Sequence, residues 1–515
     1  MKRMLVLFVM LVLIPGLLVF PADVVKKSTN VTTVKGTVRN MMDANMPSLD
    51  QLSTPRRMRP VMNFESPRKI KMHSTEPDST IVEPTLNPKT PKDVTVVAGF
   101  AGMNLTSNGA GWPPDTNGAI GPNHYVETVN TSIGIYNKST GAKISTTTFN
   151  NFFGGAGITG TPCDANNNGD PIVLYDRYAQ RWILFDFCWY STYSGGSWFA
   201  VAASQTSDPT GAWYQYAFNA DTVNMNDYPK AGVWHDGIYV TANMFSFSSS
   251  AFLGVKTWVW KKPDIYNGTL TSLSVMDTSY YAWSLLPSNA VGTTAPTGPN
   301  YLFSIDADEY GSPSTDAIPW WTCAVNWTTN TLTWTYKGVV AVSAYSIVST
   351  GVPQKGTTKK LDSLYGRPMY SAIYREPGKA YLCHVAEANS CRSTRYYELN
   401  VSTSSLTIAR QATLACTDAL HRWMASICAD KNGDIALGYS VSSSAKYPSI
   451  YVRDVIAGTE TQVKAGAGYQ KTYTRWGDYS MMDIDATDDE TFWYTNEYYA
   501  ASGTNWQTWI AHFKI

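Results

Sequence analysis

The sequence lacks the common signatures of nucleotide- and metal-dependent enzymes. Its 515 residues contain no phosphate-binding loop, Gly-x-Ser-x-Gly elbow, His-Glu-x-x-His helix or Cys-x-x-Cys pair. The six histidines show no metal-ligand spacing. Lys plus Arg equals Asp plus Glu at 40 each, so no net charge attracts the chain to nucleic acid or to an anionic membrane. We therefore expect no nucleic-acid partner.

Helical periodicity is almost absent as well. The chain has 32 Tyr, 18 Trp and 17 Phe beside only 16% charged residues, a composition that suits twisted strands. From residue 94 onward, short apolar runs alternate with Asn-Gly, Asp-Gly and Pro-Gly turns. The sequence therefore predicts an all-β protein.

The N-terminus has the features of an export signal. Met1-Lys-Arg is followed by an apolar run from Met4 to Phe20 and then by Pro21-Ala22, which predicts a signal peptide over residues 1–22. A retained anchor is the alternative, because the run reaches the lower limit for spanning a bilayer. Residues 23–93 are Pro-rich and basic, and we expect a disordered pro-region or linker there. Residues 94–515 then form one domain of a secreted or cell-surface protein, a monomer with no membrane span after signal cleavage.

Seven cysteines are compatible with disulfides in an exported chain. The sequence-close pairs are Cys383 with Cys391, Cys416 with Cys428, and Cys163 with Cys188, which would leave Cys323 as a free thiol. Spacing does not decide the connectivity, so these pairs are guesses.

One module recurs along the chain, made of an apolar strand, a polar turn and an aromatic or β-branched strand. Its copies start at Ala119, Val173, Gly232, Thr294, Ala372, Ser426 and Met482, so successive starts differ by 54, 59, 62, 78, 54 and 56 residues. A repeat of this length holds four strands and their loops, which predicts a β-propeller of about seven four-stranded blades. Six or eight blades, or an array of β-sandwiches, are the alternatives.

The last copy of the module is one strand short. Only Trp506 to Ile515 follows it as a further strand, and the strand-like run from Val94 to Phe100 can supply the missing one. We expect this pairing to close the ring and to hide both sheet edges.

Polar and aromatic residues precede the module starts. Because the inner strand of each blade would begin near one mouth of the channel, these residues are expected to form a ring there. The candidate catalytic residues are Asp115, Asp170 and Asp478, and the candidate substrate-binding residues are Arg367, Arg422, Arg475, Trp112, Tyr228, Trp423 and Trp476. Carboxylates serve as acids, bases or nucleophiles, guanidinium groups clamp anions, and flat aromatics stack on sugars.

This combination predicts that the channel mouth binds an extracellular polysaccharide or a cell-surface glycan, above all an acidic one. If the protein is an enzyme, the same residues suit a glycoside hydrolase or a polysaccharide lyase. The alternative is a non-catalytic adhesion or scaffold protein, in which the polar ring ties neighbouring blades together.

A second motif has the oxygen-ligand spacing of a calcium loop. Asp164, Asn166, Asn168 and Asp170 match its first half, although Tyr175 stands where the acidic twelfth residue is expected. This spacing predicts a structural calcium ion. Asp306-Ala-Asp308-Glu309 and Asp430-Lys-Asn432-Gly-Asp434 are shorter acidic turns of the same kind, and ordinary turns without metal are the alternative.

Two stretches near the C-terminus resemble a signature of secreted bacterial β-propeller-like proteins that are uncharacterised. They are Arg475-Trp-Gly-Asp-Tyr-Ser and Thr491-Phe-Trp-Tyr-Thr-Asn-Glu-Tyr. Asp170-Pro-Ile-Val-Leu-Tyr-Asp-Arg and Asp227-Tyr-Pro-Lys-Ala-Gly-Val-Trp resemble companion motifs. The resemblance covers residues 110 to 515 approximately, and it implies an exported propeller-like domain without an assigned activity.

The chain is also similar, more distantly, to sialidase-like propellers, in which three arginines hold a substrate carboxylate. This likeness would give that role to Arg367, Arg422 and Arg475. The Ser-x-Asp-x-Gly-x-x-Trp box is missing from the sequence, so the likeness does not extend to sialidase activity itself.

Overall fold

The computed structural model describes residues 24–43, 93–108, 111–154, 158–311, 314–347, 351–364 and 366–515. Regular structure in these ranges is almost entirely β-strand, which confirms the all-β prediction. The few helices are short: η1 (Met41–Asp43), α2 (Leu105–Asn108), α3 (Phe149–Phe153), η2 (Pro162–Asp164), α4 (Lys262–Ile265) and η3 (Asp308–Tyr310). None of the helices in the described ranges is long and apolar enough to cross a membrane. The predicted signal peptide lies outside the described residues.

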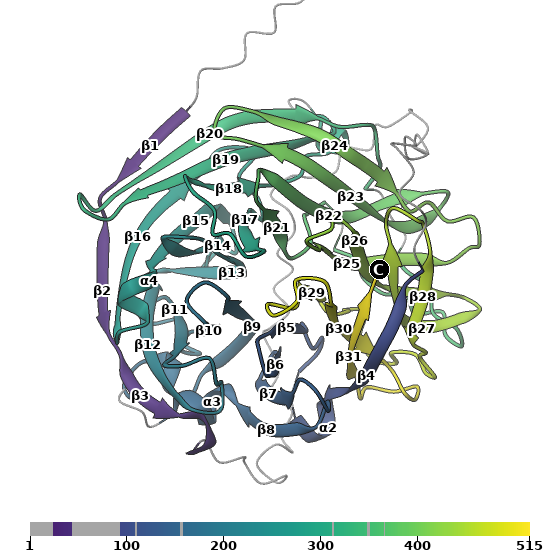
Figure 1. The fold of residues 1–515 in the computed structure, drawn as a ribbon, viewed down its shortest axis with the longest axis horizontal. Coiled ribbons are helices and arrows are strands. Elements are labelled where there is room, and N and C mark those ends of the chain that lie inside the picture. The colour runs from purple at the N-terminus through teal and green to yellow at the C-terminus, as the bar shows by residue number, and fades with distance from the viewer. Residues whose placement is uncertain are drawn as a thin grey trace, which may run out of the picture.

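Most strands belong to four-stranded antiparallel units that surround a common centre (Figure 1). Unit 1 contains β5 (Asn117–Ile120), β6 (His124–Val129), β7 (Ser132–Asn137) and β8 (Lys143–Thr148); unit 2 contains β9 (Asn167–Asp176), β10 (Arg181–Cys188), β11 (Ser197–Ser204) and β12 (Ala212–Asp221). Unit 3 contains β13 (Asn224–Val233), β14 (Gly237–Ser246), β15 (Phe252–Lys261) and β16 (Thr269–Asp277); unit 4 contains β17 (Leu286–Val291), β18 (Asn300–Phe303), β19 (Ala317–Asn326) and β20 (Thr331–Ala341).

The second half of the ring repeats this pattern. Unit 5 contains β21 (Ala372–Arg375), β22 (Lys379–Ala388), β23 (Cys391–Val401) and β24 (Leu406–Thr413); unit 6 contains β25 (His421–Ala429), β26 (Ile435–Ser443), β27 (Lys446–Asp454) and β28 (Glu460–Lys464). Unit 7 contains β29 (Met481–Ile484), β30 (Phe492–Tyr498), β31 (Gln507–Lys514) and β4 (Thr95–Asn104). Units 4 and 5 are also joined directly, because β17 and β21 pair in parallel.

The first strand of each unit lies nearest the centre (Figure 1), and consecutive first strands contact one another, with β29 contacting β5. Six of the seven module starts found in the sequence lie on these inner strands, and Thr294 follows the end of β17 by three residues. The sequence repeat therefore corresponds to the structural unit.

Polar side chains of the inner strands hold neighbouring units together. Asn117 Oδ1 accepts a hydrogen bond from the Val173 amide at 3.1 Å. Ser426 Oγ accepts one from the Met482 amide at 2.9 Å. Buried backbone amides need hydrogen-bond acceptors, and β9 and β29, which carry these two amides, are edge strands of their sheets. These side chains provide the missing acceptors.

The ring closes as the sequence predicted. β31 pairs with β4 in an antiparallel register that places Lys514 opposite Thr95 and Ile510 opposite Phe100. The Phe100 ring packs 5.5 Å from the ring of Tyr136 in unit 1, measured between centroids. The two distant parts of the chain thus complete unit 7 and fasten it to unit 1.

The prediction of disorder over residues 23–93 is wrong for residues 24–43. They form β1 (Val24–Ser28), β2 (Val31–Lys35) and β3 (Thr37–Asn40), which pair with the outer strands β20, β16 and β12 respectively. We call residues 24–43 the strap. Its strands are ordered because the open edges of three units offer backbone hydrogen bonds, a partner that local composition does not reveal.

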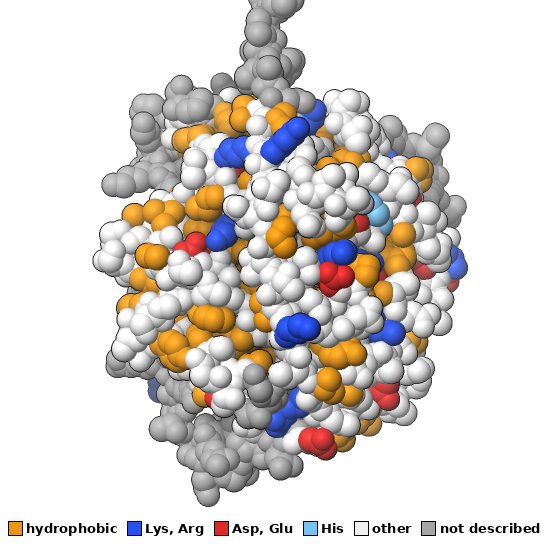
Figure 2. Space-filling view, turned by 90° about the vertical axis from the view of Figure 1, so that its left-hand side faces the viewer, with side chains coloured by type: hydrophobic (Ala, Val, Ile, Leu, Met, Phe, Trp, Pro, Cys, Tyr) orange, Lys and Arg blue, Asp and Glu red, His pale blue; other side chains and the backbone are white. Residues whose placement is uncertain are grey.

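Side chains add to the attachment of the strap. Lys26 Nζ lies 2.8 Å from Asp277 Oδ1, and Met41 is buried at 1% exposure. On the side of the molecule that carries the strap, cationic and anionic side chains are scattered among polar and apolar ones (Figure 2).

The cysteines pair differently from the prediction. Cys391 forms a disulfide with Cys416, so the proposed pairs with Cys383 and Cys428 are wrong. In the β22–β23 hairpin, Cys391 lies opposite Ala388 rather than Cys383, which explains the first error. Cys163 and Cys188 are not bonded, although their Sγ atoms lie 2.9 Å apart, and Cys323 is a buried free thiol. One disulfide is consistent with an exported protein.

The strap predicts a loss of stability on truncation. Removing residues 1–43 exposes the edges of β12, β16 and β20 and leaves the buried carboxylate of Asp277 without Lys26. We expect scanning calorimetry to show a melting temperature several degrees below that of the full chain. Removing residues 1–105 should lower it further, because β4 is lost as well. An unchanged melting temperature for the first truncation would mean that the strap contributes nothing to stability.

Candidate functional site

Three carboxylates from three units converge where the inner strands begin, which we call the amino end of the ring. Asp115 Oδ1 accepts a hydrogen bond from the Asp478 amide at 2.7 Å, and its Oδ2 accepts one from Asn130 Nδ2 at 2.5 Å. Asn130 Oδ1 in turn accepts from the Asp170 amide at 2.9 Å. Units 1, 2 and 7 therefore meet here, and Asp115, Asp170 and Asp478 are each buried.

Burial is the largest cause that raises the pKa of Asp115 well above its usual value, and the charges of Asp478 and Asp170 raise it further. Arg475 opposes this shift and donates a hydrogen bond to Asp478. A protonated carboxyl beside neighbouring carboxylates is the arrangement used for general acid and base catalysis. The amino end thus has the ingredients for proton transfer.

A buried amine lies against this group. Lys230 is 0% exposed, and its Nζ donates to the Pro229 carbonyl at 3.0 Å and lies 3.1 Å from the centroid of the Tyr228 ring. Tyr479 covers it from another side at 4.2 Å and donates a hydrogen bond to Asp170 at 3.2 Å. Burial lowers the pKa of Lys230 well below its usual value.

Sequence reasoning missed Lys230, Tyr479 and Asn130. Lys230 stands three residues after Asp227 in the motif Asp227-Tyr-Pro-Lys, and Tyr479 directly follows Asp478, so the motifs already pointed to both. Asn130 follows β6 in the turn to β7 and carries no signal of its own.

Arg367 is a half-buried cation of the site. Its guanidinium lies 5.0 Å from the centroid of the Tyr228 ring and 5.1 Å from that of Trp283. It makes no ion pair or hydrogen bond with any residue in the described ranges, and the buried Tyr228 hydroxyl also has no partner there. Two aromatic faces therefore orient a charge that remains unneutralised.

Backbone strain recurs at the same end of the ring. Asp115, Asp170 and Tyr228 adopt positive φ values of 49°, 53° and 54°. For residues other than glycine, this conformation costs on the order of 1 kcal/mol each. In β13 the register with β14 shifts between Asp227 and Lys230, which marks a bulge. Beside this bulge, the side chains of Tyr228 and Lys230 both lie against Tyr479 of unit 7.

Arg422 does not share the environment of Arg367. Its Nε lies 2.7 Å from Glu460 Oε2, and its Nη2 lies 2.9 Å from Asp418 Oδ2. Two carboxylates thus neutralise its charge and occupy its donors. The predicted clamp of three arginines is therefore not formed at Arg422.

The predicted stacking platform is wrong for two of its members. Trp423 and Trp476 are 0% exposed, and their rings pack 5.8 Å apart as part of the core. Trp112 is half-buried and stacks on Tyr473 at 4.8 Å between centroids. Tyr228 is buried and stacks on Tyr479 at 5.4 Å. The aromatic residues therefore contribute mainly to packing.

The predicted calcium loop is not formed either. Asn168 and Asp170 lie on β9, where Asn168 Oδ1 accepts from the Trp189 amide at 2.9 Å and Asp170 accepts from Tyr479. Asp164 ends η2 and Asn166 lies between η2 and β9, so the four predicted ligands are divided between a helical turn, its connection and a strand. In the described ranges, the group of carboxylates that could hold a metal ion is instead Asp308, Glu309 and Asp316.

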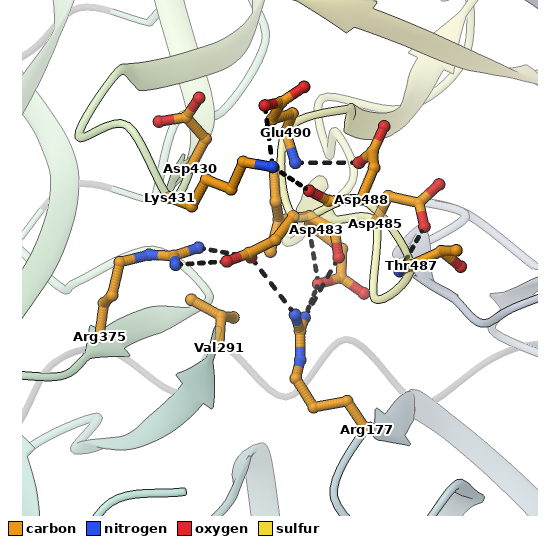
Figure 3. A network of polar contacts seen from close by, with 12 residues as sticks. Arg177, Val291, Arg375, Asp430, Lys431, Asp483, Asp485, Thr487, Asp488 and Glu490 are labelled. Atoms are coloured by element: carbon orange, nitrogen blue, oxygen red, sulfur yellow. Dashed lines mark hydrogen bonds and ion pairs between the residues drawn. The ribbon is translucent and has the colours of Figure 1, made fainter. Parts of the chain in front are cut away.

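The opposite, carboxyl end of the ring is occupied by ion pairs around the β29–β30 turn (Figure 3). Arg375 contacts both carboxylate oxygens of Asp489 at 2.7 Å. Arg177 lies 3.7 Å from Asp483 and from Asp489, and Lys431 pairs with Glu490 at 2.9 Å. Cations from units 2, 5 and 6 thus neutralise one acidic turn of unit 7, whereas Arg367 at the amino end has no such partner.

No protein-family model and no curated protein sequence matches the chain. Among solved structures, a protein of unknown function from Dyadobacter fermentans is 11% identical over 67% of this chain and 94% of its own, with a TM-score of 0.36. An ulvan lyase of polysaccharide lyase family 25 is 11% identical over 80% of this chain and 96% of its own, with a TM-score of 0.39. The sialidase of Trypanosoma rangeli is 12% identical over 66% of this chain and 53% of its own, with a TM-score of 0.33.

The network at the carboxyl end predicts unequal costs for two alanine variants. The Arg375 and Asp489 side chains are 12% and 8% exposed, so Arg375→Ala leaves the buried Asp489 carboxylate with only the longer 3.7 Å contact to Arg177 and should destabilise the fold by about 3 kcal/mol. Lys431 is 49% exposed, so Lys431→Ala should cost about 1 kcal/mol or less. Urea unfolding of both variants measures the difference, and equal losses would contradict the assignment of Arg375 as the buried member.

Glu497 predicts a pH dependence of stability. It is buried beside the site, its Oε2 accepts from the Gly477 amide at 2.9 Å, and burial raises its pKa to about 8. The folded protein thus retains a proton that the unfolded chain releases above about pH 4.5, so this residue reduces stability progressively as pH rises from 4.5 toward 8. Glu497→Gln should therefore melt at a higher temperature than the parent at pH 8, and at the same temperature below pH 4.5. A difference independent of pH would contradict the assignment.

Proposed function

We propose that this chain is an exported, seven-bladed β-propeller that binds an acidic extracellular glycan at the amino end of its ring. The seven four-stranded units, closed by β4 and β31, support the blade count. The unpaired guanidinium of Arg367 is the observation that carries the binding proposal.

Arg367 is suited to an anionic group for two reasons. Its charge has no counterion in the described ranges, so an incoming carboxylate or sulfate does not have to displace one. Its plane is already held by Tyr228 and Trp283, so little side-chain entropy is lost when it forms two parallel hydrogen bonds. A neutral glycan would leave this charge unneutralised.

The carboxyl groups at the same end extend the proposal to catalysis. A glycoside hydrolase or polysaccharide lyase would use Asp115, Asp170 and Asp478 as acid, base or nucleophile. The raised pKa of Asp115 supports a role for this residue as the proton donor. Incubation with polygalacturonate, followed by assays for new reducing ends and for unsaturated uronate, tests both reactions.

The burial of these carboxylates favours a second candidate, a non-catalytic adhesion or scaffold protein. Asp115 is 4% exposed and Asp478 5%, and the hydrogen bond between them joins units 1 and 7. In this case the carboxyl groups would brace the ring, and neither assay would show turnover even where the glycan binds.

Arg367→Lys separates binding from stability. Lysine keeps the charge but loses the planar fork, and we expect about 10-fold weaker binding of oligogalacturonate by calorimetry, a loss within the range for a charged hydrogen bond. The melting temperature should not change, because no ion pair is broken. Dextran, a neutral glycan, should bind neither protein.

Arg422→Lys is the matched control. This substitution disturbs contacts with Asp418 and Glu460, so it should lower the melting temperature and leave oligogalacturonate affinity unchanged. If Arg367→Lys binds oligogalacturonate as tightly as the parent does, the binding proposal is wrong.

A further inference from the structure

Three carboxylates gather in unit 4, in the loop between β18 and β19. Asp308 and Glu309 belong to η3, and Asp316 immediately precedes β19. One carboxylate oxygen from each lies within 4.8 Å of the others. Two of the three residues come from the acidic turn that the sequence shows at residues 306–309, but Asp316 reaches them only through the fold.

The backbone around the cluster fixes its geometry. Asp316 Oδ1 accepts a hydrogen bond from the Asp308 amide at 3.2 Å, and its Oδ2 accepts one from the Tyr345 amide at 3.0 Å. Glu309 Oε1 accepts from the Ile347 amide at 2.9 Å. The segment that follows β20 therefore holds both side chains in place.

Two buried oxygens in the cluster have nothing to bind. Glu309 is 0% exposed, yet its Oε2 has no hydrogen-bond partner, and neither does the buried Oδ1 of Asp308. No Lys, Arg or His in the described ranges forms an ion pair with any of the three carboxylates. Burying a carboxylate oxygen without a hydrogen-bond donor or a cation raises the free energy of the folded state. A cation bound between these oxygens would offset that cost.

We propose that Asp308, Glu309 and Asp316 bind a calcium ion that attaches the segment after β20 to the edge of unit 4. All the ligands are hard carboxylate oxygens, whereas structural zinc sites are built from His nitrogen and Cys sulfur. Calcium binds oxygen at about 2.3–2.6 Å, so it can bridge oxygens up to roughly 5.2 Å apart, which includes every separation within the 4.8 Å of this cluster. Magnesium, at about 2.0–2.1 Å, spans at most roughly 4.2 Å and demands an octahedron.

The ion would have a structural effect, because its ligands all lie in the loop between β18 and β19 and accept hydrogen bonds from the segment after β20. η3 lies before β19, and the Tyr345 and Ile347 amides lie after β20. Tyr310, Tyr345 and Ile347 form a small apolar cluster of their own beside the carboxylates, apart from the main core. Binding only the folded state, calcium should raise the melting temperature of the whole protein.

The first test uses the full chain stripped of metal with EDTA. Millimolar calcium chloride should raise the melting temperature by about 5 °C, the shift expected at a large excess over the dissociation constant, and millimolar magnesium should raise it less. Terbium should give sensitised luminescence on tyrosine excitation, because Tyr310 and Tyr345 adjoin the site, and calcium should displace it.

Variants assign the effect to these residues. Glu309→Gln should abolish both the calcium shift and the terbium signal, and Asp308→Asn provides the same test if the first variant fails to fold. Asp164→Asn, in the loop whose sequence resembles a calcium site, is the matched control and should retain both. Absence of any calcium shift and terbium signal in the parent, or their loss in Asp164→Asn alone, would overturn the proposal. Neither result depends on whether Arg367 binds a glycan.

Discussion

The pairing of β4 with β31 is the constraint on which the rest of this structure depends. Each unit packs its inner strand against the next and β29 of unit 7 contacts β5 of unit 1, while β4, which precedes unit 1 in the chain, pairs with β31 of unit 7. A missing fourth strand would leave the edge of β31 unpaired and exposed. The same closure brings Asp478 of unit 7 to Asp115 of unit 1, so the candidate site exists because the ring is closed.

The two ends of the ring differ in how their buried charges are paired. At the carboxyl end, an acidic turn meets cations from several units, and the ion pairs compensate for the desolvation of both partners (Figure 3). At the amino end, carboxyl groups crowd together, an amine is buried against tyrosines, and Arg367 is left without a counterion. This imbalance, together with strained residues on several inner strands, is typical of a site that binds a ligand.

The strap shows how a segment of weak local preference becomes ordered. Its valines remain largely exposed, with Val24 at 50% and Val38 at 59%, so burial of apolar surface contributes little. The outer strands of units 2, 3 and 4 instead offer unpaired amides and carbonyls, and the strap satisfies them. It also covers three edges that would otherwise be open to other chains.

The sequence by itself determined the all-β class, the sevenfold module and the closing strand, because strand periodicity and repeat spacing are local properties of the chain. It also placed Asp115, Asp170, Asp478, Tyr228 and Arg367 at one end of the ring, since equivalent positions of a repeat lie at equivalent heights. Only the tertiary structure decided which of these charges remain unpaired. Arg422 meets Glu460 and Asp418, Trp423 meets Trp476, and Asp316 meets Glu309 through contacts between separate strands and loops. The position of a residue within the repeat predicts at which end of the ring it lies. Which side chain it contacts, across a turn or on a neighbouring strand, depends on how the strands and loops pack.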